Sequence, residues 1–185
     1  MPNVVLRSDD LHWIDRTSDN PTDQCVHGEV ELTVDGTLFV VPESGDWNLT
    51  AAGVFLLRTV TDNNTSSETV CESNFLIPCC GFNPWLEGTD RYPLLIQGCN
   101  RGVNVFIEHL DDGVMLSSDD GKSVLVSESE WRKAVLGFVS EIDDWYARNP
   151  PRAEPDDEFD ARGWEALWSE WRSRSAAARS AGGSQ

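Results

Sequence analysis

The sequence predicts an α+β fold: a mostly antiparallel sheet of about five to seven strands, a buried central helix and two C-terminal amphipathic helices. Three observations lead to this prediction. Short runs rich in β-forming residues are joined by Asp-Gly turns, which is typical of antiparallel hairpins. One run is apolar at nearly every position, as in a helix surrounded by core. Two C-terminal segments repeat their apolar residues at helical spacing.

The N-terminal part of the chain predicts an edge strand and a hairpin. Residues 4–14 contain β-forming side chains interrupted by two aspartates, which favours one or two short edge strands. Residues 26–34 and 37–41 flank Asp35-Gly36, a dipeptide that tolerates the positive φ angles of a type I′ turn. The sequence therefore predicts a tight hairpin here.

A buried helix is expected over residues 49–60, where polar side chains are rare. Asn48 or Thr50 can cap this helix, because either side chain can accept a hydrogen bond from an N–H group left free at a helix start. A helix that is apolar on nearly every face belongs in the core. The polar residues 61–69 that follow predict an exposed loop.

Short strands are predicted in the next part of the chain. Two acidic turns, Asp111-Asp112-Gly113 and Asp119-Asp120-Gly121, separate the last three of them at hairpin spacing. An antiparallel meander is the simplest topology for such a series. The expected strands cover residues 75–79, 93–97, 103–109, 114–117 and 123–126.

Two amphipathic helices complete the expected fold. The first begins at Ser127 or Ser129, ends near Arg148 and places Trp131, Val135, Phe138, Ile142 and Trp145 on one face. The second covers about residues 161–174 and places Trp164, Leu167, Trp168 and Trp171 on one face. We expect residues 1–174 to form a single acidic domain and residues 175–185 to form a flexible C-terminal tail.

The charge of the chain bears on its partners. With 14 basic and 32 acidic residues, the net charge is -18. Such a field repels phosphate groups, so we expect neither nucleic acid nor membrane partners, and it accelerates association with a basic protein. Solubility alone is the simpler explanation of the same charge. No apolar run approaches the length of a membrane span and no signal-peptide pattern begins the chain, so we expect a cytoplasmic protein.

The cysteines and histidines are the candidates for chemistry. Thiolate and imidazole are ligands that suit zinc, although the paired Cys-x2-Cys spacing of common zinc sites is absent. Buried free cysteine also commonly fills a core. A zinc- or thiol-dependent enzyme or sensor is therefore the alternative hypothesis, and a protein without a cofactor is the leading one. The candidate ligands are Cys25, His27, Cys79, Cys80 and Cys99, with His109 as a further member.

Aromatic and acidic turn residues are the candidates for partner binding. Trp85 lies in a predicted loop, where an aromatic side chain has few structural roles, and tryptophan is enriched among interface hot spots. The acidic turns of the meander are expected to concentrate negative charge at one edge of the sheet. We therefore expect a partner to contact Trp85, Asp111, Asp112, Asp119 and Asp120.

Four segments together resemble an uncharacterised group of small acidic bacterial proteins. They are Cys25-Val26-His27-Gly28, Leu56-Leu57-Arg58-Thr59, Ile77-Pro78-Cys79-Cys80-Gly81 and Gly98-Cys99-Asn100-Arg101-Gly102. This resemblance covers most of the chain and implies no activity. In size, charge and lack of catalytic motifs the chain is also similar to immunity proteins, which neutralise the toxins of bacterial competition systems. That likeness in composition implies a non-enzymatic inhibitor that masks a basic toxin, and this is the leading functional hypothesis.

Overall fold

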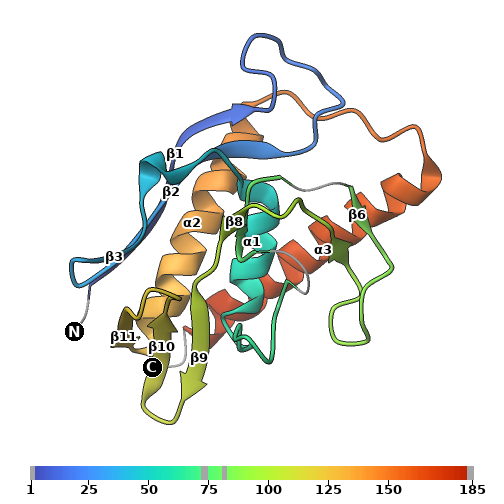
Figure 1. Ribbon diagram of the computed structural model, residues 1–185. Coiled ribbons are helices and arrows are strands. Elements are labelled where there is room, and N and C mark those ends of the chain that lie inside the picture. Colours follow the sequence, from blue (N-terminus) through green and yellow to red (C-terminus); the bar gives the residue numbers. More distant parts are fainter. Residues whose placement is uncertain (1–2, 72–74, 81–82, 183–185) are drawn as a thin grey trace.

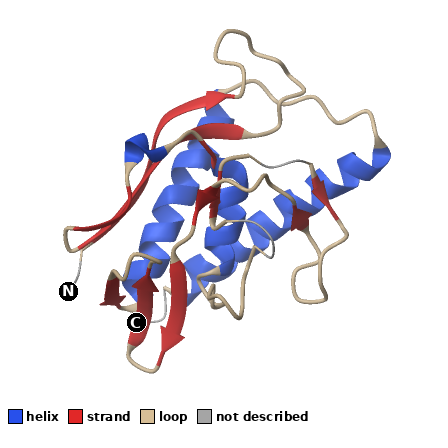
Figure 2. Cartoon of the chain, viewed as in Figure 1, coloured by secondary structure: helices blue, strands red, loops and turns tan. Residues whose placement is uncertain are grey.

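The computed structural model describes residues 3–71, 75–80 and 83–182 and confirms the predicted α+β class (Figure 1). Three helices lie together, and antiparallel strands cover and flank them (Figure 2). The strands do not form the expected single sheet of five to seven strands. They form four separate sheets in the described part of the chain, and the largest has four strands. Proline at Pro78 and Pro84 explains part of this division, because proline has no N–H group to continue a ladder.

The largest sheet is built around β2 (Val26–Val34). Antiparallel β1 (Val4–Trp13) lies on one side of β2, while β3 (Thr37–Val40) and β4 (Trp47–Asn48) pair with its two ends on the other side. A 3₁₀ turn over Pro42–Ser44 connects β3 to β4. The alternate valines and leucine of β2 are buried, so this sheet contributes one wall of the core.

The turn and the interruption predicted in this sheet are both present. Asp35 has φ 49° and Gly36 has φ 78°, which are the positive angles of the expected type I′ turn. The register of β1 against β2 shifts between Asp9 and His12, and Asp10 has φ 49°. The two aspartates therefore mark a β-bulge, which bends one continuous strand instead of dividing it into two.

The central helix is α1 (Leu49–Arg58), and every one of its residues is buried. Asn48 is the cap, because its side chain accepts a hydrogen bond from the Ala51 amide at 2.9 Å. An added Cβ at Gly53 would stand 2.4 Å from the ring of Trp171, so the missing side chain allows a second helix to pack closely against α1. The helix ends two residues earlier than the sequence predicts.

Short strands occupy the middle of the chain as predicted. Two ribbons of two strands each pair β5 with β8 and β6 with β7, while β9, β10 and β11 form the expected meander. The predicted strand over 103–109 divides into β8 and β9. The bounds are β5 (Ile77–Pro78), β6 (Pro84–Trp85), β7 (Leu95–Ile96), β8 (Gly102–Val103), β9 (Phe106–Leu110), β10 (Gly113–Ser117) and β11 (Ser123–Val126).

The amphipathic helix α2 (Glu128–Arg148) begins at a capping box. The Ser127 hydroxyl accepts from the Glu130 amide at 3.2 Å, and the Glu130 carboxylate accepts from the Ser127 amide at 3.1 Å. Its buried face includes four of the five predicted residues, and Trp145 is partly buried. The fully buried residues are Trp131, Val135, Phe138, Val139 and Ile142.

We expect the substitution Ser127→Ala to lower the free energy of unfolding by about 1 kcal/mol, because one helix amide loses its acceptor. Denaturant titration followed by circular dichroism measures the change. Ser173→Ala is the control, since Ser173 is exposed within a helix and alanine is the better helix former there. Equal midpoints for the two variants would show that the capping box does not stabilise α2.

The last helix, α3 (Glu158–Ala181), is longer at both ends than the predicted 161–174. Asp157, four residues before the predicted start, caps the helix, and its side chain accepts from the amides of Phe159 and Asp160. Ser175 and Ala178 are buried against the rest of the molecule. Residues 175–181 therefore belong to the helix and not to a flexible tail, while 183–185 lie outside the described residues.

Candidate functional site

Three of the five predicted metal ligands come together beside the β5–β8 ribbon: Cys79, Cys80 and Cys99, here called the thiol cluster. The ribbon pairs Pro78 with Gly102, and the Cys79 amide continues the pairing by donating to the carbonyl oxygen of Arg101 at 3.0 Å. The Cys99 amide donates to the Cys80 sulfur at 3.4 Å. All three cysteines are partly exposed and unbridged.

The thiols of this cluster differ in acidity. Loss of solvation raises the pKa of both Cys79 and Cys80, and the neighbouring Cys99 raises it further. Hydrogen bonding to the Cys80 thiol, the largest cause, lowers the pKa of Cys99, and the Arg101 carbonyl and Cys79 also contribute. The surroundings of Cys99 therefore favour its thiolate, which is the reactive form of cysteine.

Cys25 is the residue before β2, and His27 lies in β2. This strand belongs to a different sheet from the β5–β8 ribbon that carries the thiol cluster. Burial raises the pKa of Cys25 to about 12. Burial also lowers the pKa of His27, whose ring stacks on His12 with 6.1 Å between centroids. Among the described residues, the hydrogen bonds of the cluster run between Cys79, Cys80, Cys99 and Arg101 and do not include Cys25 or His27. The predicted ligands therefore do not converge on one point.

His109 is the additional candidate metal ligand, and each of its two ring nitrogens has a hydrogen-bond partner. Nδ1 lies 2.8 Å from the Glu128 carboxylate, and Nε2 lies 3.0 Å from the carbonyl oxygen of Thr59. Over residues 3–71, 75–80 and 83–182, no group of three or more cysteine, histidine or acidic side chains is arranged to hold a metal ion. Zinc binding stays a prediction from residue types alone.

The acidic turns of the meander do not form one edge. In a three-stranded meander the two turns lie at opposite ends of the central strand, so Asp111 and Asp112 are separated from Asp119 and Asp120 by the length of β10. Five residues of strand span about 15 Å. All four aspartates are exposed, but Asp120 pairs with Lys122 at 2.6 Å. The expectation of a single acidic edge is wrong, because consecutive hairpin turns alternate in direction.

Trp85 lies in β6 and not in the predicted loop, and it is only partly exposed. Its indole Nε1 donates to the Asp160 carboxylate of α3 at 3.0 Å. Its ring lies against Phe159, with 6.4 Å between centroids. Phe159 is 48% exposed, so the two rings together form an exposed aromatic patch.

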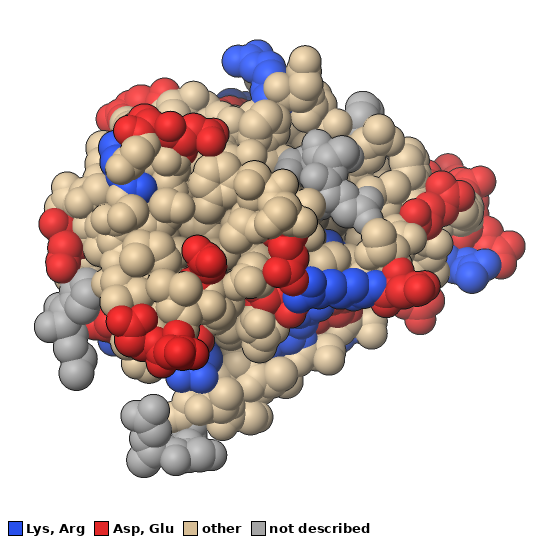
Figure 3. Space-filling model, turned by 60° about the horizontal axis from the view of Figure 1, so that its bottom comes forward, with Lys and Arg blue, Asp and Glu red and all other residues tan. Residues whose placement is uncertain are grey.

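Carboxylates directly precede this patch along the chain, and we call the patch and these acidic residues the α3 tip. Its apolar centre is Trp85 and Phe159, and its acidic rim is Glu154, Asp156, Asp157 and Glu158, all exposed. Arg162 is an exposed basic residue one turn further along α3. Acidic side chains gather at the right-hand end of the molecule in Figure 3, where α3 begins. Sequence reasoning found Trp85 but missed Phe159, which the unexpected early start of α3 brings beside it.

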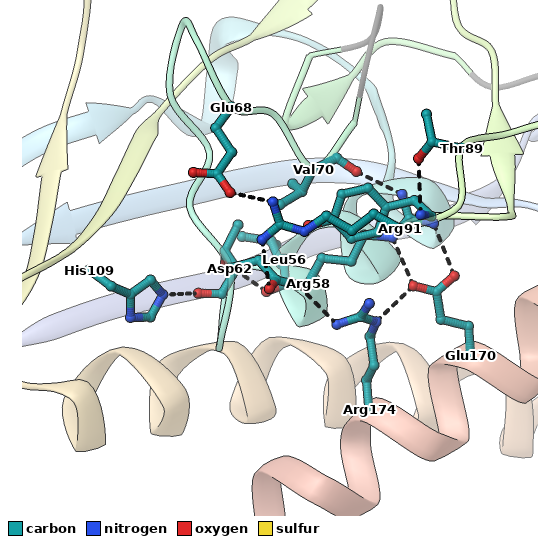
Figure 4. A network of polar contacts seen from close by, with 12 residues as sticks. Leu56, Arg58, Asp62, Glu68, Val70, Thr89, Arg91, His109, Glu170 and Arg174 are labelled. Atoms are coloured by element: carbon teal, nitrogen blue, oxygen red, sulfur yellow. Dashed lines mark hydrogen bonds and ion pairs between the residues drawn. The ribbon is translucent and has the colours of Figure 1, made fainter.

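An arginine network occupies the contact between α1 and α3 (Figure 4). Arg58 is only 1% exposed. Its guanidinium donates to both carboxylate oxygens of Glu170, at 2.8 and 2.9 Å. It also donates to the carbonyl oxygens of Val70 at 2.7 Å and Leu94 at 3.0 Å, and it lies 4.5 Å from the centroid of the Tyr92 ring.

Two further arginines extend the network toward the surface. Arg174 pairs with Glu170 at 2.7 Å and with Asp62 at 3.4 Å, while Arg91 pairs with Asp62 at 3.0 Å and with Glu68. Burial alone would raise the pKa of Glu170, but Arg58 and Arg174 together hold it below its ordinary value. Each guanidinium therefore faces a carboxylate, and the network stabilises the fold without offering positive charge to an anion.

A groove of about 840 Å³ lies between α3, the end of α2 and the connector over residues 149–157. Its walls include the rings of Tyr146, Trp164 and Trp168. Arg152, at its rim, is held by Asp19 at 2.7 Å and by the face of Trp13 at 4.0 Å. The helical spacing of the tryptophans predicted this aromatic face, but the course of the connector over it was not predictable.

Comparison of the chain with protein-family models, with curated proteins and with solved structures gives no match.

Proposed function

We propose that the protein is a non-enzymatic, immunity-type inhibitor that masks a basic toxin, and that the α3 tip is its contact surface. The observation that carries the proposal is the pairing of an exposed apolar centre with an acidic rim. Protein interfaces typically combine a buried apolar core containing aromatic residues with a polar rim. Because this rim is acidic, its complement is a basic surface.

The distribution of basic side chains supports the same proposal. More than half of them form ion pairs with carboxylates of the chain, so they add little positive charge for a partner to meet. These residues are Arg7, Arg16, Arg58, Arg91, Lys122, Arg152, Arg174 and Arg179. Most acidic residues of the described chain have no such partner, and the protein presents net negative charge to its surroundings.

The proposal is tested with the products of reading frames that neighbour the gene for this chain. We expect one of them to be a basic protein that arrests growth when expressed alone and is neutralised by co-expression of this chain. Purified, the two should associate at a rate that falls about tenfold or more between low and physiological ionic strength, because salt screens electrostatic steering. A rate independent of salt, or the lack of a binding partner among these products, would contradict the proposal.

Two matched pairs of variants locate the contact surface. Phe159→Ala should weaken binding about 30-fold, the effect typical of an interface hot spot, whereas Ile14→Ala removes a side chain that is 67% exposed elsewhere and should leave affinity unchanged. Glu154→Gln combined with Asp156→Asn should slow association more than Asp111→Asn combined with Asp112→Asn. If the Asp111 and Asp112 double variant associated more slowly than the Glu154 and Asp156 double variant, the contact surface would lie at the β9–β10 turn instead.

A further inference from the structure

The thiol cluster lies outside the residues assigned to the α3 tip, and its geometry suits a different chemistry. Cys79 and Cys80 end one strand, and Cys99 belongs to the segment that returns beside it. The ladder of Pro78 with Gly102, continued by the hydrogen bond from Cys79 to Arg101, holds the two segments together. The cluster is therefore fixed by main-chain pairing and does not depend on mobile side chains.

We propose that Cys99 is a peroxide-reactive thiol that forms a reversible disulfide with Cys80. The backbone of Cys99 already contacts the Cys80 sulfur, since its amide donates to that atom at 3.4 Å. The Cys99 thiol itself donates to the carbonyl oxygen of Arg101 at 3.9 Å, and both Cys80 and Cys99 are partly exposed. Cys79 is adjacent along the chain, but its amide pairs with the carbonyl oxygen of Arg101, and the amide of Cys99 is directed at the sulfur of Cys80.

The remaining cysteines are protected from the same reaction. Cys71 is 3% exposed, and burial raises the pKa of its thiol. Burial likewise keeps Cys25 protonated, so neither presents a thiolate to solvent. Oxidation is expected to be selective for the cluster, because susceptibility follows thiolate character and exposure.

The reaction with hydrogen peroxide balances in two steps. The Cys99 thiolate attacks one peroxide oxygen, so that an S–O bond forms, the O–O bond breaks, and the departing hydroxide takes a proton to become water. The Cys80 sulfur then attacks the sulfur of the resulting sulfenic acid, so that an S–S bond forms and the S–O bond breaks, and the departing hydroxide takes the proton of the Cys80 thiol to become a second water. Two thiols are oxidised and one peroxide is reduced, and a dithiol reductant reverses the change.

The bond would join two positions separated by 19 residues. The loop that it closes contains β6 and β7, and thus the strand that carries Trp85. A cross-link of this kind restricts the conformations of the loop. Peroxide would therefore stiffen the segment on which the start of α3 packs.

Peptide mapping of the full-length chain before and after treatment with hydrogen peroxide tests the proposal. We expect the loss of two free thiols, a cross-linked peptide containing Cys80 and Cys99, unmodified Cys25 and Cys71, and recovery of all thiols with a dithiol reductant. A cross-link between Cys79 and Cys80, or between Cys79 and Cys99, would overturn the assignment of the partner. Oxidation confined to Cys25 or Cys71, or no reaction with peroxide, would overturn the proposal as a whole.

Three serine variants separate the roles of the thiols. Cys99→Ser should lose the disulfide and consume peroxide at least about tenfold more slowly, since the reactive thiolate is gone. Cys80→Ser should stop at a sulfenic acid that dimedone traps, while Cys79→Ser, the matched control, should still form the cross-link. Circular dichroism checks that each variant is folded. Oxidation of folded Cys99→Ser at the wild-type rate would contradict the proposal.

Discussion

Replacing Arg58 by methionine should lower the free energy of unfolding by about 3–5 kcal/mol, the cost of removing one partner from a buried ion pair. Methionine fills much of the same space but donates no hydrogen bond. The carbonyl oxygens of Val70 and Leu94 lose a buried donor, and Glu170 loses its bidentate partner. Denaturant unfolding at neutral pH, monitored by tryptophan fluorescence, measures the loss.

The pH dependence of this variant has a definite sign. Because the folded protein lowers the pKa of Glu170, its ion pairs contribute their full stability above the pKa of the unfolded carboxyl group and lose it as pH falls through the folded pKa. The difference in free energy of unfolding between Arg58→Met and the wild type should therefore become smaller at acidic pH. Arg91→Gln is the control, since Arg91 makes solvent-exposed pairs and its loss should matter far less. Equal losses of stability in Arg58→Met and Arg91→Gln would show that burial of Arg58 does not determine how much its ion pair stabilises the fold.

Substituting Gly163 by alanine should destabilise the protein by about 1–3 kcal/mol or more, since overpacking forces the backbone to move. A Cβ built at Gly163 would stand 1.6 Å from the carbonyl oxygen of Pro84, so α3 would have to separate from β6. The hydrogen bond from Trp85 to Asp160 would lengthen with it. Thermal unfolding measures the loss of stability, and affinity for the proposed basic partner should fall with it.

Gly137 provides a control of opposite sign for this substitution. It lies inside α2, and a Cβ added there meets no atom within 4 Å. Gly137→Ala should therefore stabilise the protein by up to about 1 kcal/mol, because alanine is the better helix former. Similar effects of the two alanines would mean that helix propensity, and not the close approach of α3 to β6, determines the response at Gly163.

Local signals in the sequence predicted much of the fold. The Asp35-Gly36 turn, a cap at Asn48 or Thr50, a helix start at Ser127 or Ser129 and the apolar face of α2 all depend on residues close together in the chain. The division of the strands into several sheets was not predicted, because which strands pair depends on contacts between distant residues. The early start of α3 was not predicted, because Asp157 is one of several acidic residues in this segment and nothing in the sequence marks it as the helix cap.

The sites were predicted less completely than the fold. Residue type identified the thiols, and the pairing of β5 with β8 selected three of the five candidate ligands. Trp85 was found from its place in the sequence, but its partner Phe159 is far from it along the chain, and only the packing of α3 on β6 brings them together. The buried charge of Arg58 had no sequence signal, since it follows a run of apolar residues and its carboxylate partner lies 112 positions away.

Strand β2 has neighbours on both sides over much of its length. Leu32, for example, lies between Leu6 of β1 and Val40 of β3, and His27 lies between His12 of β1 and Asn48 of β4. An amide proton in such a strand exchanges with deuterium only after the flanking strands have detached. The slowest-exchanging protons of this sheet should therefore report the opening of the whole fold, while those of the outer strands report fraying.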